Sequence, residues 1–173
     1  MSGDAKKIIH PYALEFGTGN PVVDEITGKI EHVSYAGEHD KKCDLILIAP
    51  ATANTISKIA NGISDNILVY TAMSVKCPII LVPDLDLMIA DNIATNENLE
   101  KLRSRGVQIL MNLDTKSREK FIQVDEIIKF TRLYLSKNGP LQGKKIVVTV
   151  GATRESIDPV RVITNRSTGL QGW

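Results

Sequence analysis

Residues 43–55 read Cys-Asp-Leu-Ile-Leu-Ile-Ala-Pro-Ala-Thr-Ala-Asn-Thr, an apolar run followed by a loop of small and polar residues. Near-continuous apolarity, without alternation, is typical of a strand that is covered on both faces. Three similar runs follow at residues 78–82, 107–111 and 145–150. Helical patterns separate the first three runs, which is the signature of a parallel sheet with crossover helices. The sequence therefore predicts an α/β fold with a doubly wound parallel sheet.

Three helices are predicted between and after these runs. Residues 56–63 carry isoleucine and alanine at the spacing of one helix face, and Asn54 or Thr55 is expected to cap that helix. A second helix is predicted over residues 95–105, where basic side chains and a following glycine mark the end. A third begins at Val124 and ends before the turn at residues 138–140. Its expected apolar stripe comprises Ile127, Ile128, Thr131 and Leu135.

The turn-rich stretch near residue 139 is the predicted domain boundary. Residues 1–138 are assigned to a first, partial domain, and residues 139–173 to a linker and the start of a second α/β domain. The run at 145–150 would be the first strand of that second domain. A doubly wound sheet needs about five strands. We therefore expect a further strand and crossover upstream of residue 1, and the remainder of the second domain downstream.

Composition excludes several classes of protein. The chain has 173 residues, 21 basic and 20 acidic side chains, and a net charge of +1, which predicts no affinity for nucleic acid or for an anionic membrane. No apolar run approaches the ~20 residues that span a bilayer, and no secretory signal is visible, so a cytoplasmic protein is expected. Cys43 and Cys77 lack metal-ligand spacing and are expected to be reduced, buried thiols.

Candidate binding loops follow the strands, because ligands of open α/β sheets bind at the carboxyl ends of the strands. The loop at 50–55 suits a polar heterocycle or an anion, although its polar residues also fit a simple helix cap. The loop at 83–88 carries two carboxylates without a third ligand, so no metal site is predicted. Residues 151–169 hold three arginines suited to an oxyanion. His32 is a candidate general base, with a structural role as the alternative.

The loop at 50–55, Pro-Ala-Thr-Ala-Asn-Thr, resembles the flavin-binding Pro-Ala-Ser-Ala-Asn-Thr motif of the flavin-dependent cysteine decarboxylases, and residues 58–66 extend the match. The chain is most similar to the archaeal bifunctional branch of that family, which decarboxylates phosphopantothenoylcysteine and ligates cysteine to phosphopantothenate. The resemblance implies a flavodoxin or Rossmann-like sheet and FMN as the cofactor. It implies these FMN-binding residues: Pro50, Ala51, Thr52, Ala53, Asn54 and Thr55.

The same resemblance implies a catalytic role for His32. Residues 18–33 look like the family region that carries the catalytic histidine. In the family, FMN oxidises the cysteinyl end of the substrate to a thioaldehyde, which loses carbon dioxide readily because the charge passes into an enethiolate. An imidazole beside the flavin manages the protons. The family's first strand and its Gly-Ser-Ile-Ala-Ala turn, which holds the FMN phosphate, are expected upstream of residue 1.

Residues 83–88 resemble the family's Pro-X-Met-Asn-X-X-Met motif, with Leu85 in place of Met and Asp86 in place of Asn. The resemblance implies that Asp86 and Met88 contact the substrate. The family asparagine helps to hold the substrate carboxylate, whereas a carboxylate at position 86 repels that group unless it is protonated or paired. The family's cysteine-bearing flap has no counterpart in residues 112–123.

Residues 151–169 are similar to the start of the family's ligase domain, which uses CTP and Mg²⁺, and Asn165 matches the asparagine that handles the acyl-cytidylate. The match weakens at Leu170 and Gln171, where Lys-Met is usual. The resemblance therefore implies a coenzyme A biosynthesis enzyme with a small-molecule substrate that assembles as a homo-oligomer, a trimer or a dodecamer. Two alternatives stay open: an oligomeric flavoprotein-like scaffold or regulatory module without catalysis, and a relative of the flavin prenyltransferases.

Overall fold

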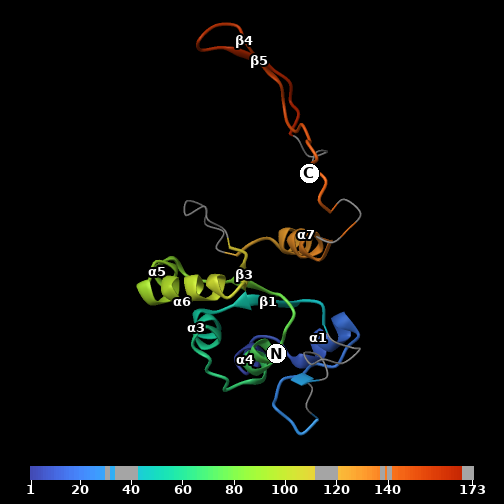
Figure 1. The fold of residues 1–173 in the computed structure, drawn as a ribbon, viewed down its shortest axis with the longest axis vertical. Helices are drawn as coiled ribbons and strands as arrows, with labels where there is room; N and C mark the ends of the chain where they lie inside the picture. The colour runs from blue at the N-terminus through green and yellow to red at the C-terminus, as the bar shows by residue number, and fades with distance from the viewer. Residues whose placement is uncertain (30–31, 34–42, 112–120, 137–138, 140–141, 169–173) are drawn as a thin grey trace. The chain divides into compact units, whose positions relative to one another are not determined.

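The computed structural model describes residues 1–29, 32–33, 43–111, 121–136, 139 and 142–168. The chain divides into two compact units, residues 1–136 and residues 137–173, and each unit is described by itself (Figure 1). The first unit contains, in order, η1 (Ala5–Lys7), α1 (Pro11–Thr18), β1 (Ile46–Ala51), α3 (Ala53–Asn61), α4 (Ile67–Ser74), β2 (Ile79–Pro83), α5 (Leu87–Ala90), α6 (Ile93–Ser104), β3 (Gln108–Ile109) and α7 (Val124–Leu135).

The first unit is built on a parallel sheet with the strand order β1-β2-β3. Ile46 pairs with Ile79 and Ile48 pairs with Leu81, and the register shifts between Ile48 and Ala51. Helices α3 and α4 connect β1 to β2, and α5 and α6 connect β2 to β3, so both connections are helical crossovers. The predicted parallel α/β architecture is confirmed, although the third strand has only two residues where five were expected.

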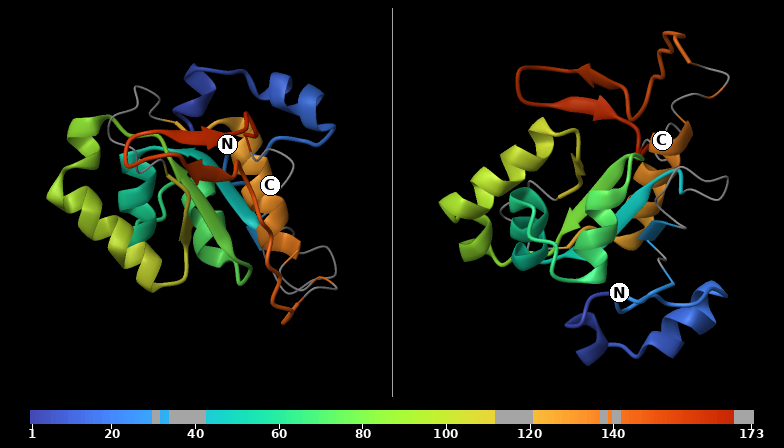
Figure 2. Two further views of the ribbon diagram at one scale, coloured as in Figure 1. Left: turned by 90° about the horizontal axis from the view of Figure 1, so that it is seen from above. Right: turned by 60° about the horizontal axis from the view of Figure 1, so that its bottom comes forward.

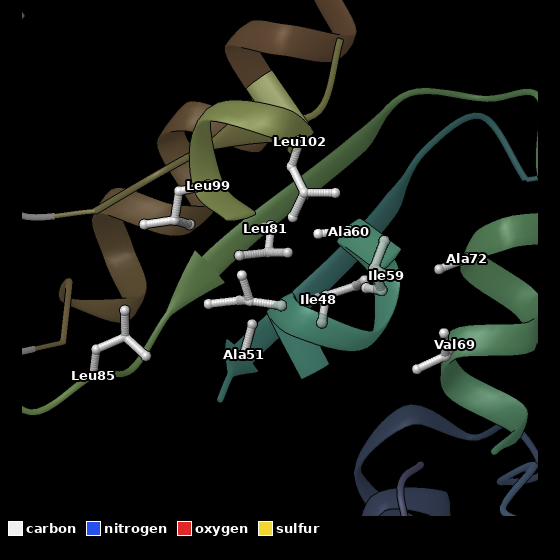
Figure 3. Packing of buried hydrophobic residues seen from close by; sticks show 11 residues of the cluster. Ile48, Ala51, Ile59, Ala60, Val69, Ala72, Leu81, Leu85, Leu99 and Leu102 are labelled. Carbon is white, nitrogen blue, oxygen red and sulfur yellow. The ribbon is translucent and has the colours of Figure 1, made fainter. Parts of the chain in front are cut away.

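Helices cover both faces of this sheet, which explains the uninterrupted apolar sequence of β2. Leu81 faces one side, where it packs with side chains of α3, α4 and α6 (Figure 3). Ile80 and Val82 face the other side and pack with Ile127 of α7. Figures 1 and 2 show α7 on the opposite side of the sheet from α3 and α4. Alternate residues of one strand therefore enter two separate cores.

The helix ends differ from the sequence expectation for local reasons. Gly62, at φ 72°, ends α3, so Ile63 lies beyond the helix and is exposed rather than part of the apolar stripe. Asn92 accepts a hydrogen bond from the Ala94 amide, and α6 therefore starts two residues earlier than predicted. The predicted helix from Val124 is confirmed, and so is the burial of Ile127, but the rest of its predicted buried face is wrong. Ile128 and Leu135 are exposed, whereas Ile127, Phe130 and Tyr134 pack in the core.

The second unit contains a two-stranded antiparallel hairpin, β4 (Arg154–Ser156) and β5 (Val162–Thr164). Asp158 shapes its turn, because the carboxylate accepts hydrogen bonds from the backbone amides of Val160 and Arg161. The prediction of a strand at residues 145–150 is wrong: these residues have no strand pairing and are exposed. A strand needs a neighbouring strand for its backbone hydrogen bonds, and within the described part of this unit only β4 and β5 pair.

Among the described residues, no helix has both the length and the apolar composition that would allow it to cross a membrane.

Candidate functional site

The predicted binding loop lies where the resemblance implied, at the carboxyl end of β1. The strand ends at Ala51, and the Ala49–Pro50 peptide bond is cis. Thr52 then caps α3, because its hydroxyl oxygen accepts a hydrogen bond from the Thr55 amide at 3.4 Å. The expectation that Asn54 or Thr55 caps this helix is therefore wrong. Both residues lie inside the first turn, since Thr52 already satisfies the exposed amide.

The side chain of Asn54 is not used to cap α3, so its amide can face a ligand. Its side chain is exposed at the start of α3 and forms no hydrogen bond with any residue that the structure describes. The hydroxyl groups of Thr52 and Thr55 lie 3.3 Å apart beside it. An amide and two hydroxyl groups at the N-terminus of a helix offer donors and acceptors to a polar heterocycle.

His32 is held against α4. Its ring meets the ring of Tyr70 edge-on, with ring centroids 4.5 Å apart and an angle of 87° between the planes. His32 is half-buried, and Tyr70 is 37% exposed. An edge-to-face aromatic contact of this kind restricts the orientation of the imidazole. Tyr70 was not predictable as a site residue, because residues 67–74 form an apolar stretch without the period of a helix.

One cavity of about 1130 Å³ brings the histidine and the loop together. The cavity is somewhat larger than the roughly 300–1,000 Å³ that is usual for ligand sites, so it has room for a cofactor. Its apolar wall is the edge of β1, at Ile46, Leu47 and Ile48. The candidate site residues that line it are His32, Pro50, Thr52, Asn54 and Thr55.

Ala51 and Ala53 do not line this cavity. Ala51 has no exposed surface and belongs to the core between the sheet and α3. Ala53 packs against the same core. Side chains alternate along a strand and repeat every three to four residues along a helix. The small residues of the loop therefore bring the backbone close to the cavity, while their methyl groups point into the protein.

The charged side chains that line the described part of the cavity, other than His32, are paired. The Lys58 ammonium lies 2.6 Å from the Asp65 carboxylate, and this hydrogen bond is the main reason that the pKa of Asp65 is lowered from its ordinary value. Lys7, the other lysine that lines the cavity, is 2.9 Å from Asp4. Next to the loop at 50–55 the cavity therefore presents neutral polar groups and apolar surface, which fit the flat, mostly uncharged ring system of a flavin.

Asp86 and Met88 lie at a different place, after the end of β2. Asp86 occupies the position before α5 without capping that helix, and Met88 is 88% exposed. Together with Leu87 and Ile89 they line a second cavity of about 370 Å³. The loops after β1 and β2 are joined by a hydrogen bond from the Asp84 amide to the Ala51 carbonyl, at 3.0 Å. The two cavities therefore belong to the same end of the sheet but have separate linings.

Asn165 lies in the second unit, where its side-chain oxygen accepts a hydrogen bond from the Ser167 amide at 3.0 Å. The side chain thus stabilises a local turn after β5. Within the described residues of the chain, no three histidine, cysteine, aspartate or glutamate side chains gather as a metal site requires.

Two family models match the chain: "Flavoprotein" over residues 1–136 and "DNA/pantothenate metabolism flavoprotein C-terminal domain" over residues 141–173. The coenzyme A biosynthesis bifunctional protein CoaBC of Thermococcus kodakarensis is 49% identical over 175 residues, covering 99% of this chain and 43% of that protein. CoaBC of Methanocaldococcus jannaschii is 37% identical over 175 residues, covering 99% of this chain and 42% of that protein.

Among solved structures, the FMN-dependent cysteine decarboxylase SpaF is similar, with a TM-score of 0.63 and 26% identity. The similarity covers 79% of this chain and 77% of that chain. The chain spans less than half the length of the two curated relatives described above.

Proposed function

Because the chain belongs to the flavoprotein family, we propose that residues 1–136 bind FMN and decarboxylate phosphopantothenoylcysteine to phosphopantetheine. The predicted family and the predicted α/β fold are confirmed by the family match and by the similarity to SpaF. CoaBC of Thermococcus kodakarensis, at 49% identity, is named for coenzyme A biosynthesis, which supports this substrate for the present chain.

One observation carries the proposal. A single cavity is lined both by the loop that the resemblance assigns to flavin and by the imidazole assigned to catalysis. These residues are separated by at least 18 positions in the sequence, from His32 to Pro50, and only the fold brings them together. A polar heterocycle beside a proton-transferring group is the arrangement that a flavin-dependent decarboxylation requires.

The residues that line the cavity have different roles in the proposed reaction. Asn54 and Thr55 would hold the polar part of the flavin through hydrogen bonds, and the edge of β1 would supply the apolar surface. The FMN, when bound, supplies a reversible acceptor for two electrons from the cysteinyl end of the substrate. An imidazole nitrogen of His32 receives and returns the proton at that end of the substrate, and the contact with Tyr70 keeps the ring oriented.

Asp86 and Met88 form the proposed contact with the carboxylate end of the substrate. Asp86 adds negative charge to its small cavity, which disfavours a substrate carboxylate there unless a cation or a proton accompanies it. Replacement of Asp86 by Asn, the residue of the family motif, should change the KM for the substrate if this position contacts it. FMN binding should not change, because Asp86 does not line the larger cavity.

The remaining parts of the proposal concern the whole protein. We propose that its second domain ligates cysteine to phosphopantothenate with CTP and Mg²⁺, with Asn165 at the acyl-cytidylate, and that the protein acts in the cytoplasm. Self-association as a trimer or a dodecamer is supported by exposed apolar side chains around α5. These are Leu87, Met88, Ile89 and Ile93.

The test is an FMN titration combined with an assay of carbon dioxide release from phosphopantothenoylcysteine. Asn54→Ala should weaken FMN binding by about 2- to 10-fold, the value of one hydrogen bond. His32→Gln should retain FMN binding and lower carbon dioxide release by about 10²- to 10⁴-fold. Asn96→Ala, an exposed amide in α6, is the matched control and should change neither.

Each competing function has its own outcome in this experiment. FMN binding without any carbon dioxide release would favour the non-catalytic scaffold. Transfer of a prenyl group to the flavin would favour the prenyltransferase relative. Failure of the folded protein to bind FMN, or equal activity in His32→Gln and the unaltered chain, would reject the proposed mechanism.

A further inference from the structure

Two cysteines meet at the opposite end of the sheet from the candidate site. Cys43 precedes β1 and Cys77 precedes β2, and their sulfur atoms are 3.4 Å apart. Both are free thiols, and both are half-buried rather than fully buried as expected. Their pairing was not predictable, because 34 positions separate them in the sequence. Only the adjacency of the two strands brings them into contact.

The backbone around the two cysteines suits a covalent link. The Ile46 amide donates a hydrogen bond to the Pro78 carbonyl at 3.0 Å, and Ile46 pairs with Ile79. Neighbouring strands lie about 4.8 Å apart, and disulfides join Cα atoms that are about 4.4–6.8 Å apart. The strand pairing therefore fixes the two backbones within disulfide range immediately beside the cysteines. The sulfur atoms, at 3.4 Å, lie about 1.4 Å beyond the ~2.0 Å length of a disulfide bond.

From this geometry we propose that Cys43 and Cys77 are an oxidation site, at which a small-molecule disulfide converts the two thiols into an intrachain disulfide. One thiolate attacks a sulfur of the oxidant RS–SR, forms a mixed disulfide and expels RS⁻. The second thiol then loses its proton and displaces the remaining RS group as a thiolate. Two protein thiols become one disulfide, and RS–SR is reduced to two RSH.

The surroundings of Cys77 disfavour one of the two routes by which the bond could be reduced. Burial, followed by the hydrogen bond and charge of Cys43, raises the pKa of Cys77 to about 11. A thiol with a high pKa is a poor leaving group, so reduction by attack on the Cys43 sulfur is slow. The neighbouring thiol is also already in place to resolve a mixed disulfide, which favours the intrachain product over a lasting adduct.

The closed loop contains β1, α3 and α4, which carry the candidate binding loop and Tyr70. A cross-link over a loop of this length stabilises a fold mainly by restricting the unfolded chain. The cysteines lie at the amino ends of the strands, whereas the loop at 50–55 follows the carboxyl end of β1. The disulfide is therefore expected to raise thermal stability without changing FMN binding.

The test treats the reduced protein with oxidised glutathione and measures free thiols and intact mass under non-reducing conditions. The unaltered chain should lose both thiols and two hydrogen atoms, and should carry no glutathione. Cys43→Ser and Cys77→Ser should each carry one glutathione at the remaining cysteine. Retained thiols, lasting glutathione adducts on the unaltered chain, or disulfide-linked dimers would each overturn the proposal.

Thermal unfolding of the same samples tests the consequence of loop closure. The oxidised chain should melt on the order of 5–15 °C above the reduced chain, as expected for a loop of this length in a protein of this size. The double variant Cys43→Ser/Cys77→Ser should melt at the same temperature with and without oxidant. An equal or lower Tm in the disulfide form would refute the stabilising role.

Discussion

Loss of the Thr52 hydroxyl tests how the sequence builds the candidate site. In Thr52→Val the side chain keeps its shape but no longer accepts the hydrogen bond from the Thr55 amide. Loss of an N-cap typically costs about 0.5–2 kcal/mol. Here the distance is 3.4 Å and the residue is exposed, which places the cost in the lower half of that range, about 0.5–1 kcal/mol. For a chain of this size the Tm should fall by about 1–4 °C.

The assay is urea unfolding at equilibrium, with Thr52→Ser and Asn54→Ala as controls. Serine retains the hydroxyl and should restore most of the lost stability. Asn54→Ala should change the free energy of unfolding by no more than about 0.5 kcal/mol, because Asn54 does not cap the helix. The midpoint should shift in Thr52→Val with an unchanged m-value. A larger loss in Asn54→Ala than in Thr52→Val would refute the assignment of the cap.

Three further outcomes are expected. Tyr70→Leu should lower carbon dioxide release by about 2- to 12-fold, because the aromatic contact that orients His32 is lost. Tyr70→Phe keeps the ring and should preserve most of the rate, and equal rates in the two variants would contradict this role. Asp65 has a pKa below its ordinary value of 3.8, so its pairing with Lys58 stabilises the fold above that pH, and this stabilisation is lost as the pH falls through the lowered pKa. The melting temperature of Asp65→Asn should therefore fall less at acid pH than that of the unaltered chain, and an unchanged pH profile would count against the pairing. Leu81→Ala, at a fully buried position of β2, should lower the free energy of unfolding by about 2–5 kcal/mol in urea, and a cost below 1 kcal/mol would be inconsistent with the described core.

The central strands of the fold were predictable because a strand that is buried on both faces has an uninterrupted apolar sequence. The apolar residues of β2 enter two cores, and the sequence shows this as a run without alternation. The same pattern was misleading at residues 145–150, which are apolar but do not pair with any strand in the described part of the unit. Helix α4 was missed because Ile67–Ser74 is apolar on most sides and lacks a helical period.

The site was predictable in position but not in detail. Loops at the carboxyl ends of parallel strands are common binding sites, and four of the six residues at 50–55 line the cavity. Whether a methyl group of this loop points into the core or toward the cavity depends on how the strand and the helix pack. The sequence therefore could not show that Ala51 and Ala53, unlike the other four residues, point into the core. Tyr70 reaches His32 only through tertiary packing, for which a single sequence carries no signal.

The most direct test of the central claim is a crystal structure of the protein with FMN. The isoalloxazine ring should lie in the cavity beside Asn54 and Thr55, with the imidazole of His32 facing the same ring. A flavin bound elsewhere, or one that His32 does not face in any subunit of the crystal, would contradict the account.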